Sequence, residues 1–419
     1  MNAIHSSKWR SAKDAIGLVT SGMTVAIETL SAEPLALTAA LWEHACDLKD
    51  LTVLTGLLAD YPFARTKARE NVRLRCWFLP GTLMKGATGE IKAEFLPLNI
   101  VQTFRFLQST PTDLALVQVS PANAQGMHSL GINTSFSRAM LRSAKLVIAE
   151  VNDAMPFAMG DSLVHESELD ILVATNRPLP ESSLRVADDA IDLSIGLRAA
   201  KLVQDGSTVA LGIGSIPGAF VEGLIQLGRQ DLLLINLLTD AGRKLIESGC
   251  CGTQNPKAVV GDVMGTRELY RWLANNPAIH MADALATHSV ESLHARKNFV
   301  SVSSALEIDL YSQANSEWLG GKQAGGIGGS MDFAIGAQFE GGLSIFALRS
   351  TTSSGASRIV PRFKGDGPIT IPRTLVQVVV TEYGVADLRK LSVRERALAL
   401  ASIAHPSHRQ SLVEAAAQI

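Results

Sequence analysis

The clearest indication of the fold is the segment DGSTVALGIGSIPGAFVEGLIQLGRQDLLLINLLTD, at residues 205–240. Residues 208–211 are apolar and partly β-branched, which predicts a short strand. Residues 212–217, GIGSIP, predict a turn that leads into a helix. Residues 232–238 predict a second buried strand that contains one polar residue, Asn236. A strand, a glycine turn, a helix and a strand in this order form the repeating unit of a parallel α/β sheet.

The turn at 212–217 is also a candidate binding element. Pro217 suits the first position of a helix, because its missing N–H would have no partner there. Free N–H groups at a helix N-terminus bind phosphate groups or stabilise a reacting carbonyl oxygen. The turn is not a dinucleotide fingerprint, because Pro217 replaces the third glycine, and the chain has no Gly-Lys-Ser/Thr of a P-loop. An ordinary tight turn is the alternative interpretation.

The same strand pattern occurs near the N-terminus. LVTSGMTVAI at 18–27 and LVQDGSTVAL at 202–211 agree at six of ten positions. A second similarity links the apolar runs 145–152 and 374–383, which contain Glu150 and Glu382 near their ends. These similarities predict two tandem copies of an open α/β domain, with mostly parallel sheets and flanking helices. Chance likeness of short apolar strands is the alternative.

The length and composition fit this architecture. A chain of 419 residues exceeds one typical core, and a polar linker near residue 180 predicts domains at 1–185 and 186–419. The net charge of −2 predicts no nucleic-acid partner. The sequence shows no signal peptide and no apolar run of about 18 residues, so we expect no membrane span and a cytoplasmic location. The four cysteines lack metal-ligand spacing, so we expect no metal.

Two other groups of residues are candidates for chemistry. Residues 320–329 contain six glycines, and such density indicates a backbone that approaches a ligand closely. Two glycine loops together could contact a long ligand such as a nucleotide-bearing thioester. No Gly-x-Ser-x-Gly elbow is present, so Ser215 is interpreted as structural. Cys250 and Cys251 could hold a thiolate, although adjacent cysteines more often fill space.

Several segments resemble one known family. VTEYGVADL at 380–388, LSVRERA at 391–397 and IAHP at 403–406 look like the C-terminal signature of the acetyl-CoA hydrolase/transferase family, which includes 4-hydroxybutyrate CoA-transferases. Similar segments occur in the same order along nearly the whole chain, among them GIGSIP at 212–217 and ALEIDL at 305–310.

The resemblance implies tandem CoA-transferase/NagB-like domains that act on coenzyme A thioesters. It further implies an acyl-CoA substrate, an acyl acceptor such as a small carboxylate, and a homodimer. The residues implied to contact coenzyme A are Gly212, Gly214, Ile216, Pro217, Gly328 and Gly329.

The chain departs from the family at the residue that resembles the nucleophile. Members use a glutamate after the strand that follows GIGSIP, and its carboxylate attacks the thioester and becomes an enzyme-bound CoA thioester. Alignment on Thr239 and Asp240 places Asn236 in its position, and no glutamate occurs between Glu222 and Glu247. An amide cannot form the anhydride, but it can donate a hydrogen bond to an oxyanion.

Two further positions depart from the family pattern. Glu28 begins the segment that replaces a Gly-His-Gly-like turn, and Ser330 replaces the glutamine of a Gly-Gly-Gln loop. We therefore take Asn236, Ser330 and Glu28 as the candidate catalytic residues.

Three functions remain open from the sequence. The first is an acyl-CoA enzyme that catalyses acyl transfer, thioester hydrolysis or chemistry at the α-carbon without a glutamyl-CoA intermediate. The second is an ordinary CoA-transferase whose glutamate is relocated, with Glu28 as the candidate. The third is a non-catalytic subunit that binds acyl-CoA.

Overall fold

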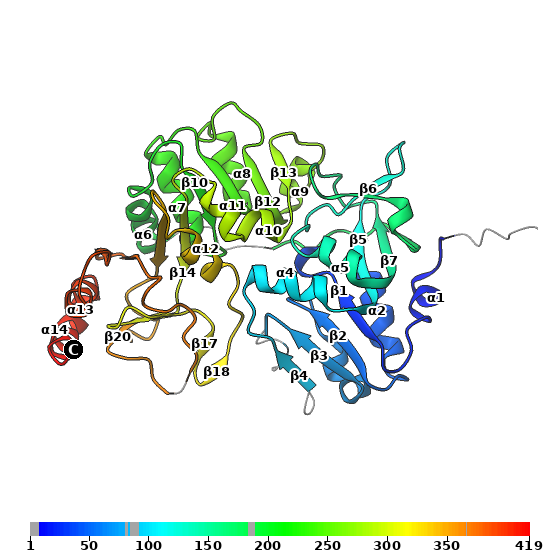
Figure 1. Cartoon of the computed structure of the whole chain (residues 1–419), viewed down its shortest axis with the longest axis horizontal. Coiled ribbons are helices and arrows are strands. Elements are labelled where there is room, and N and C mark those ends of the chain that lie inside the picture. Colours follow the sequence, from blue (N-terminus) through cyan, green and yellow to red (C-terminus); the bar gives the residue numbers. More distant parts are fainter. Residues whose placement is uncertain (1–7, 80–82, 84–91, 183–188, 366) are drawn as a thin grey trace, which may run out of the picture. The chain divides into compact units, whose positions relative to one another are not determined.

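The computed structural model describes residues 8–79, 83, 92–182, 189–365 and 367–419. The chain divides into two compact units (Figure 1): unit 1 comprises residues 1–182 and 261–284, and unit 2 comprises residues 183–260 and 285–419. The domain boundary expected at 185/186 lies outside the described residues, and it stays a prediction.

Unit 1 is built on a seven-stranded sheet with the order β4-β3-β2-β1-β5-β7-β9. Each adjacent pair of its strands is parallel. The strands are β1 (Thr24–Ile27), β2 (Leu51–Thr55), β3 (Val72–Cys76), β4 (Lys92–Phe95), β5 (Thr112–Val119), β7 (Ala144–Asn152) and β9 (Ile171–Thr175), with a separate antiparallel pair β6 (Met127–Ser129) and β8 (Leu163–His165). The helices are α1 (Ala12–Ile16), α2 (Leu35–His44), α4 (Ile100–Ser109), α5 (Ser137–Ser143) and α9 (Arg267–Leu273).

The second sheet has eight strands in the order β13-β12-β11-β10-β14-β19-β21-β22. Its strands are β10 (Thr208–Leu211), β11 (Leu233–Leu238), β12 (Ala258–Val263), β13 (Ile279–Met281), β14 (Val300–Ser304), β19 (Leu343–Ala347), β21 (Val378–Thr381) and β22 (Gly384–Asp387). The helices are α6 (Ala190–Ala200), α7 (Ser215–Gln226), α8 (Asp240–Glu247), α10 (Ala284–His288), α11 (Val290–His294), α12 (Ser330–Gly336), α13 (Val393–Ser402) and α14 (Pro406–Ala416). Short strands β15 (Glu307–Asp309), β16 (Ala314–Asn315), β17 (Trp318–Leu319), β18 (Lys322–Gln323) and β20 (Ile359–Val360) form two small sheets.

The two large sheets share one topology, which confirms the tandem α/β fold expected from the sequence. In each sheet the first strand, β1 or β10, lies in the middle, and its neighbours on both sides are parallel to it. The matching segments 18–27 and 202–211 end in these two central strands. The order of the strands reverses beside each of them, and ligands of open α/β sheets bind at the carboxyl edge of such a switch point.

The second pair of similar segments lies in strands that do not occupy equivalent positions in the two sheets. Residues 145–152 lie in β7, two places from β1, whereas residues 374–383 contain β21, three places from β10. Buried parallel strands share an apolar, β-branched composition wherever they lie in a sheet. This similarity therefore reflects burial. The similarity of residues 18–27 to residues 202–211 is the one that marks the repeat.

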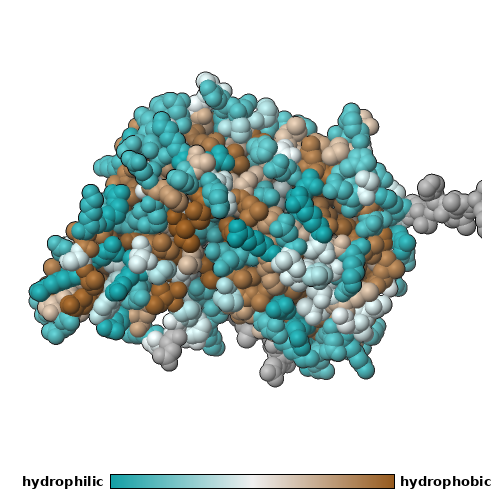
Figure 2. Space-filling model, in the orientation of Figure 1, coloured by the Kyte–Doolittle hydropathy of each residue, from teal (hydrophilic) through white to brown (hydrophobic). Residues whose placement is uncertain are grey.

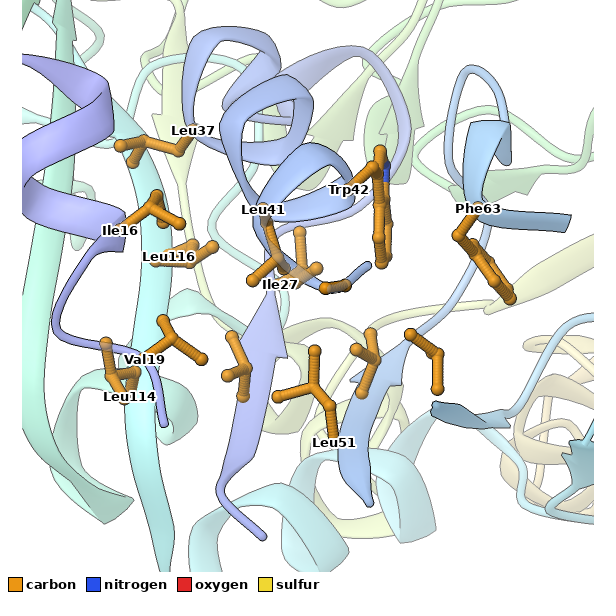
Figure 3. Close-up of a cluster of buried hydrophobic side chains, with 14 of the residues drawn as sticks. Ile16, Val19, Ile27, Leu37, Leu41, Trp42, Leu51, Phe63, Leu114 and Leu116 are labelled. Atoms are coloured by element: carbon orange, nitrogen blue, oxygen red, sulfur yellow. The ribbon is translucent and has the colours of Figure 1, made fainter. Parts of the chain in front are cut away.

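The core of unit 1 lies between its sheet and the helices α1 and α2. Figure 3 shows side chains from these helices packed over apolar side chains of β1, β2 and β5. Leu37 and Leu41 lie four positions apart on α2, so they project from one face of the helix toward the sheet. The side chains Ile27, Leu51, Leu114 and Leu116 form the facing surface.

In unit 2 the side chains of the central strands alternate between two faces of the sheet. Ala210 of β10 and Ile235 of β11 are register partners, and both pack in one cluster with Leu293 of α11 and Phe333 of α12. Successive residues of a strand point to opposite faces. The neighbouring residue Val209 therefore faces the other side of the sheet.

The exposed surface is mixed in character. Figure 2 shows hydrophilic side chains over the face in view, with apolar ones between them. Among the described residues, no helix combines the length and the apolar character that a membrane crossing requires.

Glycines set the close packing of α6 on α7. A Cβ at Gly196 would lie 2.5 Å from the carbonyl oxygen of Ala219, and a Cβ at Gly223 would lie 2.9 Å from the Cβ of Ala200. Backbone atoms cannot move aside as a flexible side chain can. Gly196 is therefore required by the close approach of the two helices.

We expect Gly196→Ala to lower the free energy of unfolding by about 1–3 kcal/mol, because the added methyl group overpacks the contact between α6 and α7. Urea denaturation measures this change. Gly218→Ala in α7 is the matched control: its Cβ would meet no atom within 4 Å, and alanine gains about 1 kcal/mol of helix propensity. Equal effects of the two substitutions would contradict the packing argument.

Candidate functional site

The turn after β10 presents backbone atoms at the carboxyl edge of the second sheet. Gly214 has φ 123° and caps α7 without a side-chain hydrogen bond. This backbone conformation strongly favours glycine. Ile213 and Gly214 are exposed, whereas Ile216 and Pro217 are buried. The turn therefore offers its backbone to solvent while its second half is fixed in the core.

The helix begins two residues earlier than the sequence predicted. α7 starts at Ser215, so Pro217 occupies its third position, and the predicted first position was wrong. Proline is tolerated there because N–H groups in the first turn have no partner within the helix. The N–H groups of Ser215 and Ile216 remain in this first turn, and they suit a phosphate or carbonyl oxygen.

Asn236 lies on β11, one residue beyond the last register pair of β10 with β11, Ala210 and Ile235. Its Nδ2 donates a hydrogen bond to the carbonyl oxygen of Leu211, 3.0 Å away. The side-chain amide therefore links the two strands where their backbone pairing stops. Leu211 directly precedes the glycine turn, so this bond also fixes the start of that turn.

The backbone of Asn236 has φ 86°. Positive φ is uncommon outside glycine, and asparagine is among the residues that tolerate it best. Such backbone conformations gather at functional sites. The residue as a whole is half-buried.

The second glycine loop lies against a histidine of the same unit. A Cβ at Gly329 would lie 2.7 Å from Nε2 of His288. His288 is buried and stacks on Phe333 with ring centroids 4.7 Å apart, and its Nδ1 lies 2.8 Å from Oγ1 of Thr287. Glycine at 329 lets the loop rest directly on this ring. Gly328 has φ 60° and is half-buried.

Other glycines of the predicted glycine-rich region have a different role from Gly328 and Gly329. Gly320 and Gly321 have φ 59° and 78° and connect the antiparallel strands β17 and β18. Two-residue hairpin turns of this kind favour glycine at both positions. The hairpin explains these two glycines, so Gly328 and Gly329 are the glycines of this region that we retain as candidates for close approach to a ligand.

Ser330 and the paired cysteines have local structural roles. The Oγ of Ser330 donates to the carbonyl oxygen of Ile327, 3.0 Å away, at the start of α12. Cys250 and Cys251 are buried, and burial raises the pKa of Cys251 to about 12. A thiol with this pKa stays protonated near neutral pH, so Cys251 is unsuited to act as a thiolate nucleophile.

Glu28 follows β1 directly, in unit 1. Its N–H donates to the carbonyl oxygen of Leu116 in β5, 3.0 Å away, so it lies at the switch point of that sheet. The side chain is only 1% exposed, and neither carboxyl oxygen has a hydrogen-bond partner. Burial raises the pKa of Glu28 to about 8. The Ser137 hydroxyl favours the charged form, but it donates its hydrogen bond to the carbonyl oxygen of Asn133.

Two other glutamates of unit 1 are equally buried but differ from Glu28 in their bonding. Glu33 accepts a hydrogen bond from the N–H of Ala59 at 2.7 Å, and Glu150 accepts one from the N–H of Ala36 at 2.8 Å. Buried polar groups in proteins nearly always have such partners. Hydrogen bonds therefore explain how the carboxyl groups of Glu33 and Glu150 are accommodated in the interior, whereas the carboxyl group of Glu28 has no such bond.

Asp262, on β12, is a second buried acidic group of unit 1, and it is not among the residues predicted from the sequence. Its Oδ2 accepts a hydrogen bond of 2.6 Å from the Ser135 hydroxyl, and its Oδ1 has no partner. Burial raises the pKa of Asp262 to about 6, and its charge contributes to the raised pKa of Glu28. A single acidic residue inside the apolar run AVVGDV was the signal available in the sequence.

His288 was also missed, because one histidine gives no sign in the sequence of contact with a glycine loop some forty residues later. Unit 2 brings together the turn at 212–217 and Asn236, through the bond to Leu211. The described part of the chain contains no group of three or more His, Cys, Asp or Glu side chains placed to hold a metal ion.

Comparison with known proteins identifies the class to which this tandem α/β fold belongs. The acetyl-CoA hydrolase/transferase N-terminal domain matches residues 2–180, and the C-terminal domain of the same name matches residues 265–416. The chain belongs to the acetyl-CoA hydrolase/transferase family. It is an enzyme of the acyl-CoA transferase/hydrolase type.

Individual relatives agree along nearly the whole chain. The 4-hydroxybutyrate coenzyme A transferase of Clostridium kluyveri is 32% identical, over 98% of this chain and 97% of the relative. The succinyl-CoA:acetate/propanoyl-CoA:succinate CoA transferase of Fasciola hepatica is 33% identical, over 98% and 88%. The crystal structure of RipA from Yersinia pestis matches with a TM-score of 0.90 and 31% identity, over 100% of this chain and 99% of that one.

The unpartnered Glu28 makes the stability of the protein depend on pH. Because its pKa is about 8 in the folded state and 4.5 in the unfolded state, the stability due to its proton is complete below pH 4.5 and is lost as the pH rises to about 8. The loss amounts to at most about 5 kcal/mol. Glu28→Gln keeps the shape of the protonated acid and should remove this dependence.

Urea denaturation of both proteins from pH 5 to pH 8.5 measures the effect. As the pH rises from 5 to 8.5, we expect the free energy of unfolding of the variant to increase relative to that of the parent protein. A constant difference across this range would show that the Glu28 pKa is not raised.

Proposed function

We propose that this chain acts on an acyl-CoA thioester without forming a glutamyl-CoA intermediate at the β11 position. The observation that carries the proposal is the end of β11, where Asn236 has a positive φ and an amide bound to the Leu211 carbonyl oxygen. The resemblance places a nucleophilic glutamate at this position, but the side chain here is an amide, which is no nucleophile for a thioester.

Coenzyme A binding is proposed for the two glycine loops of unit 2. The turn at 212–217 provides the N–H groups of Ser215 and Ile216, together with the glycine-dependent conformation of Gly214. The loop at Gly328 and Gly329 provides backbone that lies close to the His288 ring. Backbone N–H groups at a helix N-terminus suit a phosphate, and the names of the relatives support a CoA thioester as the ligand.

Asn236 is proposed to donate a hydrogen bond to the thioester oxygen. One N–H of its amide is directed at the Leu211 carbonyl oxygen, and an amide nitrogen carries two hydrogens. A donor held in place before the reaction stabilises the charge that develops on the carbonyl oxygen. Ser330 is proposed to fix the loop that contains Gly328 and Gly329, because its hydroxyl donates a hydrogen bond to the carbonyl oxygen of Ile327 in that loop.

The alternative of a relocated nucleophile is less well supported. Glu28 has a pKa raised to about 8, so most molecules carry it as the neutral acid at pH 7. A neutral carboxylic acid is a poor nucleophile toward a thioester, because the attacking species is the carboxylate. The names of the relatives suggest a small carboxylate as one acceptor to test.

Trapping distinguishes these mechanisms. The pure protein is incubated with acetyl-CoA, butyryl-CoA or succinyl-CoA, treated with borohydride, and digested for peptide mass analysis. We expect turnover of at least one thioester and no reduced glutamate or CoA adduct. An adduct on Glu28 would establish the relocated nucleophile, and acyl-CoA binding without any turnover would indicate a non-catalytic subunit.

Asn236→Ala should lower kcat by about 100- to 1000-fold, the loss typical of one removed oxyanion donor. Asn298→Ala is the matched control, because Asn298 is also in unit 2 with a positive φ of 43° but precedes β14, at the opposite edge of the sheet. Both substitutions strain the backbone, so equal losses of kcat would argue against a role for the Asn236 amide.

A further inference from the structure

Unit 2 contains a pocket of about 330 Å³ beside its small sheet β16-β15-β20. Its lining includes Asp309, Tyr311 and Gln313, from the end of β15 and the turn that follows, and Arg362 and Arg373, from the two ends of the loop after β20. Arginine is the side chain that proteins use most for planar, bidentate recognition of phosphate and carboxylate groups. Two arginines in one pocket therefore indicate a site for an anion.

Backbone pairing explains why the two arginines meet in one pocket. The N–H of Leu310, just after β15, donates to the carbonyl oxygen of Val360, at the end of β20, 2.9 Å away. At the other end of the loop, Ile371 exchanges two backbone hydrogen bonds with β16, of 3.0 and 3.1 Å. Both ends of the loop are thus attached to the same small sheet. Arg362 and Arg373 each lie two positions beyond one of these attachments.

The guanidinium group of Arg362 is held by Tyr311. Its Nη2 donates to the Tyr311 hydroxyl at 2.6 Å, and its Cζ lies 4.5 Å from the centre of the ring. A guanidinium group has five N–H donors, so this bond leaves most of them for a ligand. Among the described residues, no carboxylate lies within ion-pair distance of Arg362 or Arg373.

The acidic residue among the described lining residues does not cancel this positive charge. Asp309 is 1% exposed, and its two carboxyl oxygens accept hydrogen bonds of 2.8 and 2.7 Å from the N–H and Nε2 of Gln313. Burial raises the pKa of Asp309, and these hydrogen bonds and the charge of Arg362 lower it in part. The segment RFKGDGPITIPR at 362–373 has three basic residues and one acidic residue. Basic residues therefore outnumber acidic ones even when Asp309 is counted.

The arrangement of the donors favours a phosphate group over a carboxylate. Arg362 and Arg373 come from different ends of the loop, so their N–H groups approach a shared ligand from more than one direction. A phosphate group has three acceptor oxygens in a tetrahedral arrangement, whereas the two oxygens of a carboxylate lie in one plane. The planar fork of arginine matches both groups, but two separate forks are best used by the group with more oxygens.

We propose that this pocket binds a phosphate group carried by a small molecule, with Arg362 and Arg373 as the residues that contact it. The inference does not depend on the proposed function, because neither Asn236 nor the two glycine loops line this pocket. A water molecule in the liquid occupies about 30 Å³, so the pocket has room for about ten atoms of that size. A diphosphate or a small phosphate ester should therefore bind more tightly than inorganic phosphate.

Isothermal titration calorimetry of the full chain tests the site, with inorganic diphosphate, glycerol 3-phosphate and inorganic phosphate as probes. We expect saturable binding of diphosphate. Arg362→Gln and Arg373→Gln should each raise its Kd by about ten-fold or more, because each removes hydrogen bonds to a charged group. Both side chains are exposed, so we expect both variants to fold. An unchanged Kd in both variants would overturn the proposal.

Two comparisons separate a phosphate site from general attraction of anions. Arg389→Gln is the matched control, because Arg389 is an exposed arginine of unit 2 that pairs with Asp387 at 2.7 Å and does not line the pocket. It lowers the net charge by the same amount and should leave the Kd for diphosphate unchanged. Equal weakening in all three variants would overturn the proposal. Binding of succinate that is tighter than that of diphosphate would also overturn it, because the pocket would then select carboxylates.

Coenzyme A itself carries phosphate groups, so its own site must be distinguished from this pocket. The diphosphate titration is repeated with acetyl-CoA in excess, and we expect the same Kd. Competition between the two ligands would place the probe in the coenzyme A site and overturn the proposal. Diphosphate binding that depends on both arginines, in a protein that turns over no thioester, would support this pocket and contradict the proposed function.

Discussion

Both large sheets are organised by the parallel pairing of a central strand with a neighbour on each side. β1 pairs with β2 and β5, and β10 pairs with β11 and β14, so each sheet reverses its order at its first strand. The carboxyl ends of these strands meet at one edge. The residues that follow β1 and β10, Glu28 and Gly212, are therefore placed at the two switch points of the chain.

The two switch points have diverged in chemistry while keeping one topology. The one in unit 2 is formed by backbone: a glycine turn, a helix start without a side-chain cap, and the Asn236 amide that binds the strand before the turn. The one in unit 1 has a buried acid and several acceptor atoms without partners. A backbone site suits phosphate and carbonyl oxygens, whereas an acceptor site suits a hydroxyl group.

Much of the fold was predictable because its signals are local. Strands at 208–211 and 232–238 were expected from apolar, β-branched runs, and the structure has β10 and β11 at those places within one residue. The start of α7 was missed by two residues, because proline is tolerated anywhere in a first turn. The likeness of 145–152 to 374–383 was misleading, because buried parallel strands look alike wherever they lie in a sheet.

The sequence by itself determined the family, the tandem repeat, the candidate turn and the absence of a glutamate on β11, because each of these can be read from residues close together in the chain. The folded structure was needed to show that Glu28 has no hydrogen-bond partner while Glu33 and Glu150 do, and that Asp262, more than half of the chain away, lies near Glu28. Burial and hydrogen bonding depend on segments distant in sequence. The pKa of a carboxyl group therefore cannot be inferred from its neighbours in the chain.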